Sequence, residues 1–513
     1  MHDQILQPAS DVWRHHCAAL VDALTQAIRE LDRLVRLDEY HRHGHDPQDL
    51  EKAIGPLGSS ALDLNALSRI LGESTRTRAM APDRLERVQR LLKELGEMKA
   101  RCVTDPHTCA SIEIDEDENT IHEAAENHLN RMATVFRALR IAQLETRSKY
   151  DPGTHDAVFS SFDWRQLSPA ELRLCPPFLV IARLNRETGP QLRKMMSLLE
   201  SRKPVKIAAL RSSFSKSYSS TSDTSVPASM ALETLPLAMR GVSFVQTCIA
   251  APDFQKRIFD GLTSPRPGVI SLLCRRDDEA HEAFVLRAER AIHSRAFPIC
   301  VYDPDRAHGF VTCFDLSANP SPETLWISET FSAPDENGEI RKHTEPYTFA
   351  HFAAGEEEFA SEFTAIDPAV PADHLIPIAD YLDLTRRQRV GVQPVLTRHH
   401  AGQAIDRRVV SQVMVTQTGD RLHLWRTLQE ISGINNPYVN TTRSALSKEF
   451  GVQQKALLES LQRDMEKAAS HREQVAVAAA VRKLVAHLTG VDASEIDLRG
   501  ILPPPSEAVT SPP

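Results

Sequence analysis

Five short apolar runs between Pro176 and Pro304 dominate the hydrophobic pattern of the chain, and amphipathic helical patterns separate them. Runs of this length, alternating with helices, are typical of a parallel sheet with crossover helices. The sequence therefore predicts an α/β unit whose ligand site lies in the loops after its strands. The runs are residues 178–183, 204–210, 242–248, 268–274 and 296–302.

Different patterns flank this unit on both sides. Apolar residues at helical spacing predict a helical N-terminal region, and a mixed pattern after the unit predicts an α+β extension followed by a helical region. The chain ends in a proline-rich tail that we expect to be disordered. The predicted division is 1–165 helical, 166–330 α/β, 331–440 α+β, 441–500 helical and 501–513 disordered.

Two local predictions concern the C-terminal part of the chain. Residues 407–416 alternate as a strand does, and Gln417-Thr-Gly-Asp then predicts a turn. Residues 444–488 predict a long helix, broken near Gly451.

The acidic runs 115–118 and 356–358 are interpreted as solvated surface.

Composition narrows the class of protein. The net charge of -9 argues against a nucleic-acid partner. The eight cysteines include no Cys-x-x-Cys pair, which favours buried thiols in a reducing compartment. No apolar run follows Met1, and none reaches the roughly 18 residues of a membrane span. We therefore expect a cytoplasmic protein with no membrane partner.

The loop after the second run is unusually rich in serine, with eight serines between Arg211 and Ser225. Hydroxyls, guanidinium groups and backbone N–H groups at a strand end suit a phosphate or carboxylate. A mobile polar loop without a ligand is the alternative. The candidate anion crevice consists of Arg183, Asn185, Arg211, Ser212, Ser213, Lys216 and Ser217.

One part of the chain resembles a known family. Residues 288–304, ending in Ala-Phe-Pro-Ile-Cys-Val-Tyr-Asp-Pro, resemble the end of the thiamine-diphosphate domain of pyruvate:ferredoxin/flavodoxin oxidoreductases. Residues 264–274 resemble that family's Pro-Gly-Pro, apolar strand and Cys segment. Residues 244–259 are similar to the preceding strand–helix unit, and residues 205–225 occupy the place of its cofactor loop. The resemblance covers residues 176–330 and implies a thiamine-diphosphate-binding fold.

The family's cofactor positions carry other residues here. The resemblance implies an Asp ligand of Mg²⁺ at Leu184 and an Asn ligand near Ser217, and a leucine offers no oxygen to the metal. Asn185 or Glu187 would substitute only through a shift of register. Cys274 matches a [4Fe–4S] ligand, but a cluster needs four thiolates and the family's other three are not present at matching positions. We therefore expect neither Mg²⁺–thiamine diphosphate nor a cluster.

Three hypotheses follow from this reading. The first is a non-catalytic homologue that serves as a scaffold or docking component, with other subunits of a redox complex as partners. The second is a protein that binds a phosphate or carboxylate ligand in the old cofactor crevice. The third is an active thiamine-dependent 2-oxoacid oxidoreductase component completed by other subunits. The first is preferred because the metal ligands are missing, although the sequence leaves open whether the chain is an enzyme.

Overall fold

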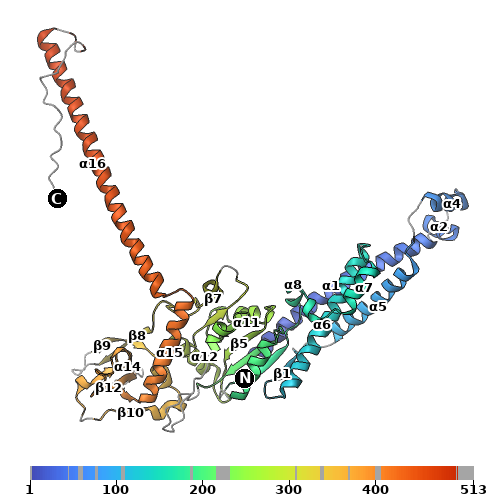
Figure 1. Ribbon diagram of the computed structural model, residues 1–513, viewed down its shortest axis with the longest axis horizontal. Helices are drawn as coiled ribbons and strands as arrows, with labels where there is room; N and C mark the ends of the chain where they lie inside the picture. Colours follow the sequence, from blue (N-terminus) through green and yellow to red (C-terminus); the bar gives the residue numbers. More distant parts are fainter. Residues whose placement is uncertain are drawn as a thin grey trace. The chain divides into compact units, whose positions relative to one another are not determined.

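The computed structural model divides the chain into two units, Met1–Ile434 and Asn435–Pro513 (Figure 1). The first contains a helical region, a seven-stranded sheet and a smaller α+β region. The second contains a long helix. The described residues are 3–43, 45–55, 62–74, 79–104, 110–184, 189–214, 232–306, 309–334, 340–367, 370–398, 406–490, 492 and 494.

Three long helices form the N-terminal region, as the apolar spacing predicts. They are α1 (Asp3–His43), α5 (Pro82–Thr104) and α6 (Glu118–Thr146). Leucines at helical spacing on α1 are buried against α5 and α6, which gives the bundle its own core. The shorter elements are α2 (Pro47–Ile54), α4 (Leu64–Ser74), α7 (Pro152–Ser160), η1 (Trp164–Gln166) and α8 (Pro169–Leu172).

A mostly parallel sheet forms the centre of the first unit, which confirms the predicted α/β class. The strand order is β1-β2-β3-β5-β4-β6-β7, and the first five strands in this order are parallel. The fifth apolar run does not continue the parallel series, because β6 pairs antiparallel with β4. The strands are β1 (Ser111–Glu113), β2 (Leu179–Arg183), β3 (Lys206–Arg211), β4 (Ser243–Thr247), β5 (Gly268–Leu273), β6 (Cys300–Tyr302) and β7 (Phe314–Asp315).

The edge strand β1 was not predicted from the sequence. It lies between two long helices of the N-terminal region and pairs with β2, with Ile112 opposite Val180. Its three residues have no apolar run to mark them, and they are half-buried or exposed. The N-terminal region therefore contributes both a helical bundle and one strand of the sheet.

Helices cover both faces of the sheet. Val180 and Ile181 are consecutive on β2 and therefore point to opposite faces. On the face of Val180, α9 (Gly189–Glu200) and α10 (Leu235–Ala238) pack with the first turn of α6. On the face of Ile181, α11 (Phe254–Thr263) packs with the first turns of α1. Both faces are buried, which explains why the strands are almost entirely apolar.

The α+β region packs on α12 and has two further sheets. The hairpin β8–β9 is antiparallel, and the other sheet has the order β10-β13-β12-β11. Its core joins α12, α13 and α15 to the carboxyl end of the main sheet. The elements of this region are β8 (Ile327–Pro334), β9 (Ile340–Tyr347), α13 (Phe349–Ala353), η4 (Glu357–Glu362), β10 (Phe363–Ala365), η5 (Ala372–His374), β11 (Leu375–Pro377), α14 (Ile378–Asp383), β12 (Gln393–Arg398), β13 (Asp406–Val410) and α15 (Gln412–Ile431). Between strands of the main sheet lie η2 (Leu232–Thr234), α12 (His281–His293) and η3 (Phe310–Cys313).

The strand predicted at 407–416 is too long, and the turn predicted after it is wrong. β13 ends at Val410, and α15 continues through 417–420. Ser411 caps this helix, since its Oγ accepts a hydrogen bond from the Met414 backbone N–H at 3.1 Å. The sequence around the boundary alternates apolar and polar residues, a pattern that also occurs in the first turn of a helix.

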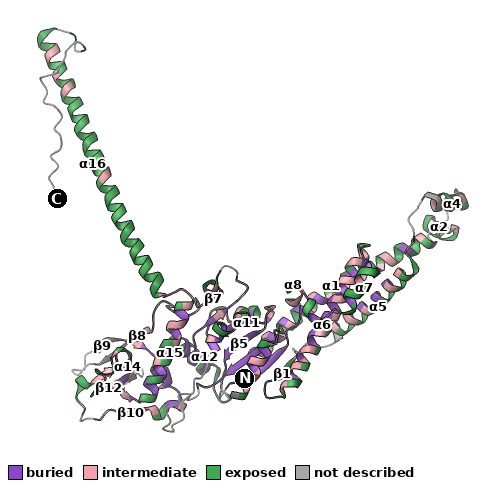
Figure 2. Ribbon diagram, viewed as in Figure 1, coloured by how far each residue is buried: buried purple, intermediate pink, exposed green. Residues whose placement is uncertain are grey.

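The second unit contains α16 (Pro437–Thr489), which passes through Gly451 without interruption. The predicted break was therefore wrong: one glycine costs a helix about 1 kcal/mol relative to alanine, which does not end a long helix. No residue of α16 is buried (Figure 2). Within the described part of the chain, no helix combines the length and apolar character that a membrane crossing requires.

Candidate functional site

The predicted anion crevice lies at the carboxyl ends of β2 and β3, and part of it is outside the described residues. Arg183 ends β2, and its Nη2 donates to Glu113 Oε1 of β1 at 3.0 Å. Leu184, where the resemblance implies an Asp ligand of Mg²⁺, is 5% exposed and packs in the core. The predicted positions outside the described residues are Asn185, Glu187, Lys216 and Ser217.

The other three predicted residues are consecutive at the end of β3. Arg211 and Ser212 are buried, and Ser213 is half-buried. The backbone N–H of Cys274 donates to the carbonyl oxygen of Arg211 at 2.7 Å, so the ends of β3 and β5 are side by side. The structure thus places Arg211–Ser213 at the edge where parallel sheets bind ligands, with Arg183 one strand away.

Cys274, which the resemblance aligns with a cluster ligand, lies in the hydrophobic core. Its side chain packs with apolar residues of α1 and α11, and its Sγ is 3.7 Å from the carbonyl oxygen of Leu272. Burial raises the pKa of this thiol to about 12, which disfavours the thiolate that would bind a metal. The described residues contain no group of three or more His, Cys, Asp or Glu side chains suited to hold a metal ion.

Two carboxylates from the α+β region reach the ends of β3 and β5. Glu356 accepts a hydrogen bond from Arg276 Nη2, and Glu358 Oε1 accepts one from the Phe214 backbone N–H at 2.7 Å. Glu356 is 5% exposed, so the interpretation of 356–358 as a solvated run was wrong for this residue. Burial raises the pKa of both carboxyl groups, while Arg276 opposes the rise for Glu356 and the Phe214 N–H opposes it for Glu358.

A buried arginine connects α12 to the same strand ends. The Nε and Nη2 of Arg287 donate to Glu279 at 2.7 and 2.8 Å, and its Nη2 and Nη1 donate to the carbonyl oxygens of Cys274 and Ser212 at 2.9 and 3.3 Å. Sequence reasoning missed this group. The available signal was its place on the apolar stripe of α12, three residues after the buried Phe284.

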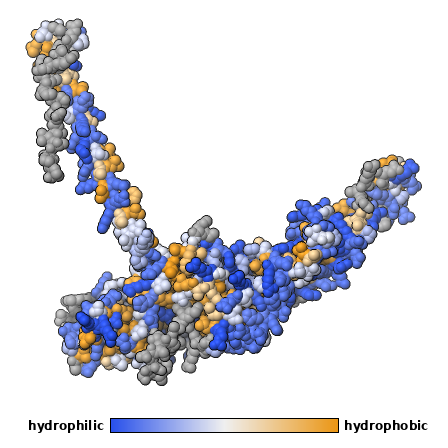
Figure 3. Space-filling model, viewed as in Figure 1, coloured by the Kyte–Doolittle hydropathy of each residue, from blue (hydrophilic) through white to orange (hydrophobic). Residues whose placement is uncertain are grey.

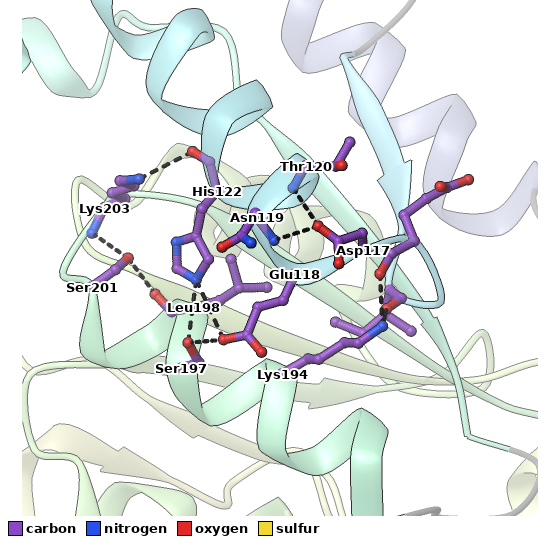
Figure 4. Close-up of polar contacts among 12 residues, drawn as sticks. Asp117, Glu118, Asn119, Thr120, His122, Lys194, Ser197, Leu198, Ser201 and Lys203 are labelled. Carbon is purple, nitrogen blue, oxygen red and sulfur yellow. Dashed lines mark hydrogen bonds and ion pairs between the residues drawn. The ribbon is translucent and has the colours of Figure 1, made fainter.

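A second polar cluster joins the start of α6 to α9 (Figure 4). Ser197 Oγ donates to Glu118 Oε1 at 2.5 Å, and His122 Nε2 is 3.2 Å from the same Oγ. In a catalytic triad the acid orients the histidine, whereas here the acid binds the serine itself. Lys194 Nζ donates to the carbonyl oxygen of Glu116 at 2.6 Å. These bonds hold α9 against the turn between β1 and α6, and the Ser197 hydroxyl donates its proton to Glu118 and so does not donate it to His122.

A hollow of about 430 Å³ opens at the opposite, amino end of β4, lined by α11 and the end of β6. The charged groups that line it include ion pairs: Arg257 Nη1 is 3.4 Å from Asp315 Oδ2, and Arg306 Nε is 3.9 Å from Asp303 Oδ2. Both signs of charge are present, so the lining selects neither an anion nor a cation.

The described residues at the carboxyl edge of the main sheet therefore include an ionic cluster, beside the core residues Leu184 and Cys274, at which the resemblance implies ligands of a cofactor. No model of a known protein family and no curated protein matches the chain.

Proposed function

We propose that the chain is a non-catalytic docking component of a protein assembly and that α16 is its docking element. The observation that carries this proposal is the exposure of large apolar side chains along a helix without a buried residue. Phe450, Met465 and Leu488 are 64%, 71% and 75% exposed. Figure 3 shows apolar side chains along this helix between polar stretches. Large apolar side chains exposed along one helix indicate an interaction site, because their contact with water costs free energy and a partner that covers them removes this cost.

Seven of the apolar side chains of α16 form two stripes on different faces. An α-helix turns about 100° per residue, which puts the members of each stripe within about 60° of one another and the two stripes about 140° apart. Spacings of three and four residues within each stripe are those of helices that pair in coiled coils. A helix with two such faces suits a scaffold that contacts two surfaces at once. The stripes are Leu458, Leu461 and Met465 in the middle, and Val477, Val481, Leu484 and Leu488 near the end.

The residues described at the carboxyl edge support the non-catalytic part of the proposal. Leu184 belongs to the core, and Glu356 and Glu358 take up the donors of Arg276 and Phe214 that a ligand would need. The choice of a 2-oxoacid oxidoreductase complex as the assembly rests on the sequence resemblance of residues 176–330. Photo-cross-linking from the two stripes of α16 tests the docking role.

We predict that the purified chain does not bind thiamine diphosphate in the presence of Mg²⁺, because Leu184 supplies no oxygen to the metal. Isothermal titration calorimetry of the full chain should give only heats of dilution. A matched titration with Mg²⁺ alone corrects for weak binding of the ion to surface carboxylates. Saturable, Mg²⁺-dependent heat with a micromolar dissociation constant would contradict the non-catalytic assignment.

A further inference from the structure

The cluster at the ends of β3 and β5 has the composition of an anion site that is already filled. Its donors come from the loops that follow these two strands: the Phe214 N–H follows β3, and Arg276 follows β5. Both donors bind carboxylates, at Glu358 and Glu356. Guanidinium and backbone N–H groups at a strand end are the usual donors to phosphate and carboxylate groups.

The two carboxylates arrive from a distant segment and enter the cluster on alternate residues. Glu356 is buried and Glu358 is half-buried, while Glu357 between them is exposed. Glu356 lies 80 residues from Arg276 in the sequence, and Glu358 lies 144 from Phe214. The segment 356–358 therefore places the carboxylates of Glu356 and Glu358 in the cluster, while the side chain of Glu357 between them is in solvent.

The charges of the cluster are unequal. Arg276 pairs with Glu356 and Arg287 pairs with Glu279, whereas the hydrogen bond that Glu358 accepts comes from the uncharged Phe214 N–H. Burying a second carboxylate beside one cation costs desolvation and repulsion. An occupant held at such a cost is replaced more easily than one whose charges balance.

We propose that the ends of β3 and β5 form a binding site for a phosphate or carboxylate group, and that Glu356 and Glu358 are an internal occupant which such a ligand displaces. Once the two acids leave, Arg276 and the Phe214 N–H become free donors, while Arg287 stays bound to Glu279 and to the carbonyl oxygens of the strand ends. The site then carries one unpaired positive charge. This proposal is independent of the docking role of α16.

The test removes the internal charge and measures anion binding by the full chain. Inorganic phosphate and malonate, at constant ionic strength, serve as the two probes in calorimetry. The double variant Glu356→Gln/Glu358→Gln keeps the shape of both side chains but removes their charge, so we expect it to bind at least one probe tenfold more tightly than the unmodified chain. Binding of phosphate alone assigns a phosphate group, and binding of malonate alone assigns a carboxylate.

Two further substitutions in the double variant locate the site. Arg276→Met should abolish the gain in affinity. Arg275→Met is the matched control, because Arg275 precedes Arg276 in the same loop and is exposed, and it should leave the gain unchanged. Failure of the double variant to bind either probe overturns the proposal, and so does a gain that survives Arg276→Met.

A second measurement needs no variant. In the unmodified chain, saturating phosphate or malonate should slow hydrogen exchange at the Phe214 amide, compared with sodium chloride at equal ionic strength. The slowing is expected because a bound anion that displaces Glu358 accepts the hydrogen bond of this amide more strongly than Glu358 does. It should also speed exchange in residues 355–359, because the displaced segment loses its contacts. Unchanged exchange in residues 355–359 with either anion overturns the displacement.

Discussion

Replacing Arg295 by Met is expected to lower the free energy of unfolding by about 1–3 kcal/mol, the usual cost of leaving buried hydrogen-bond acceptors unpaired. Arg295 is 0% exposed, at the turn after α12. Its Nη2 donates to the carbonyl oxygens of Pro320 and Ser321, both at 3.0 Å. Its guanidinium is 4.2 Å from the centre of the Trp425 ring. One side chain thus links α12, the segment before β8, and α15.

Methionine fills much of the same volume but donates no hydrogen bond, so the carbonyl oxygens become unpaired in the core. Arg290→Met is the matched control, since Arg290 is in the last turn of α12, just before Arg295, and is exposed; it should change stability by less than about 0.5 kcal/mol. Urea denaturation followed by tryptophan fluorescence measures both. Equal midpoints for the two variants would show that the buried guanidinium does not hold these elements together.

Lys206 is expected to make the stability of the chain rise with pH above neutrality. It is 1% exposed, and its Nζ donates to the carbonyl oxygens of Ser264, at 2.8 Å, and Arg266. Burial lowers the pKa of this amine to about 7, and Asp305 opposes the shift. Between pH 7 and about 10.5 the unfolded chain therefore binds one proton more than the folded chain, which makes the free energy of unfolding increase with pH, by at most about 1.4 kcal/mol per unit.

The Lys206→Met variant should lack this contribution. Between pH 7 and 9 its free energy of unfolding should rise less steeply than that of the unmodified chain, with a difference in slope that approaches about 1.4 kcal/mol per pH unit. Lys256→Met, at an exposed position, should keep the original slope. Parallel pH profiles for the chain and its Lys206→Met variant would mean that the amine stays charged when the protein folds.

The main sheet was predictable because its strands are buried on both faces. Val, Ile and Leu fill β2 and β5 almost without interruption, so the pattern marks them even without a structure. β1 has no such run, and its place in the sheet depends on pairing with β2, which no local pattern encodes. The start of α15 was missed for a related reason, since the cap at Ser411 decides between two conformations that the alternating sequence allows equally.

The candidate site was predicted only where it follows a strand. Arg211 and Ser212 are at the expected edge because strand ends are visible in the hydrophobic pattern. Glu356 and Glu358 were not assigned to this edge, because an acidic run is usually solvated and their partners are 80 or more residues away in the sequence. Contacts over such separations depend on how α12 and α13 pack, and the sequence pattern does not show this.

Photo-cross-linking along α16 in the cells that produce the protein tests its docking role most directly. A photoreactive amino acid replaces Leu461 or Leu484, one from each stripe, and Arg463 or Lys483 serves as the neighbouring control on the opposite face. We predict discrete adducts with another protein from positions 461 and 484, and none from the two controls. Absence of adducts, equal adducts from all four positions, or adducts formed only between two copies of the chain would contradict the docking role.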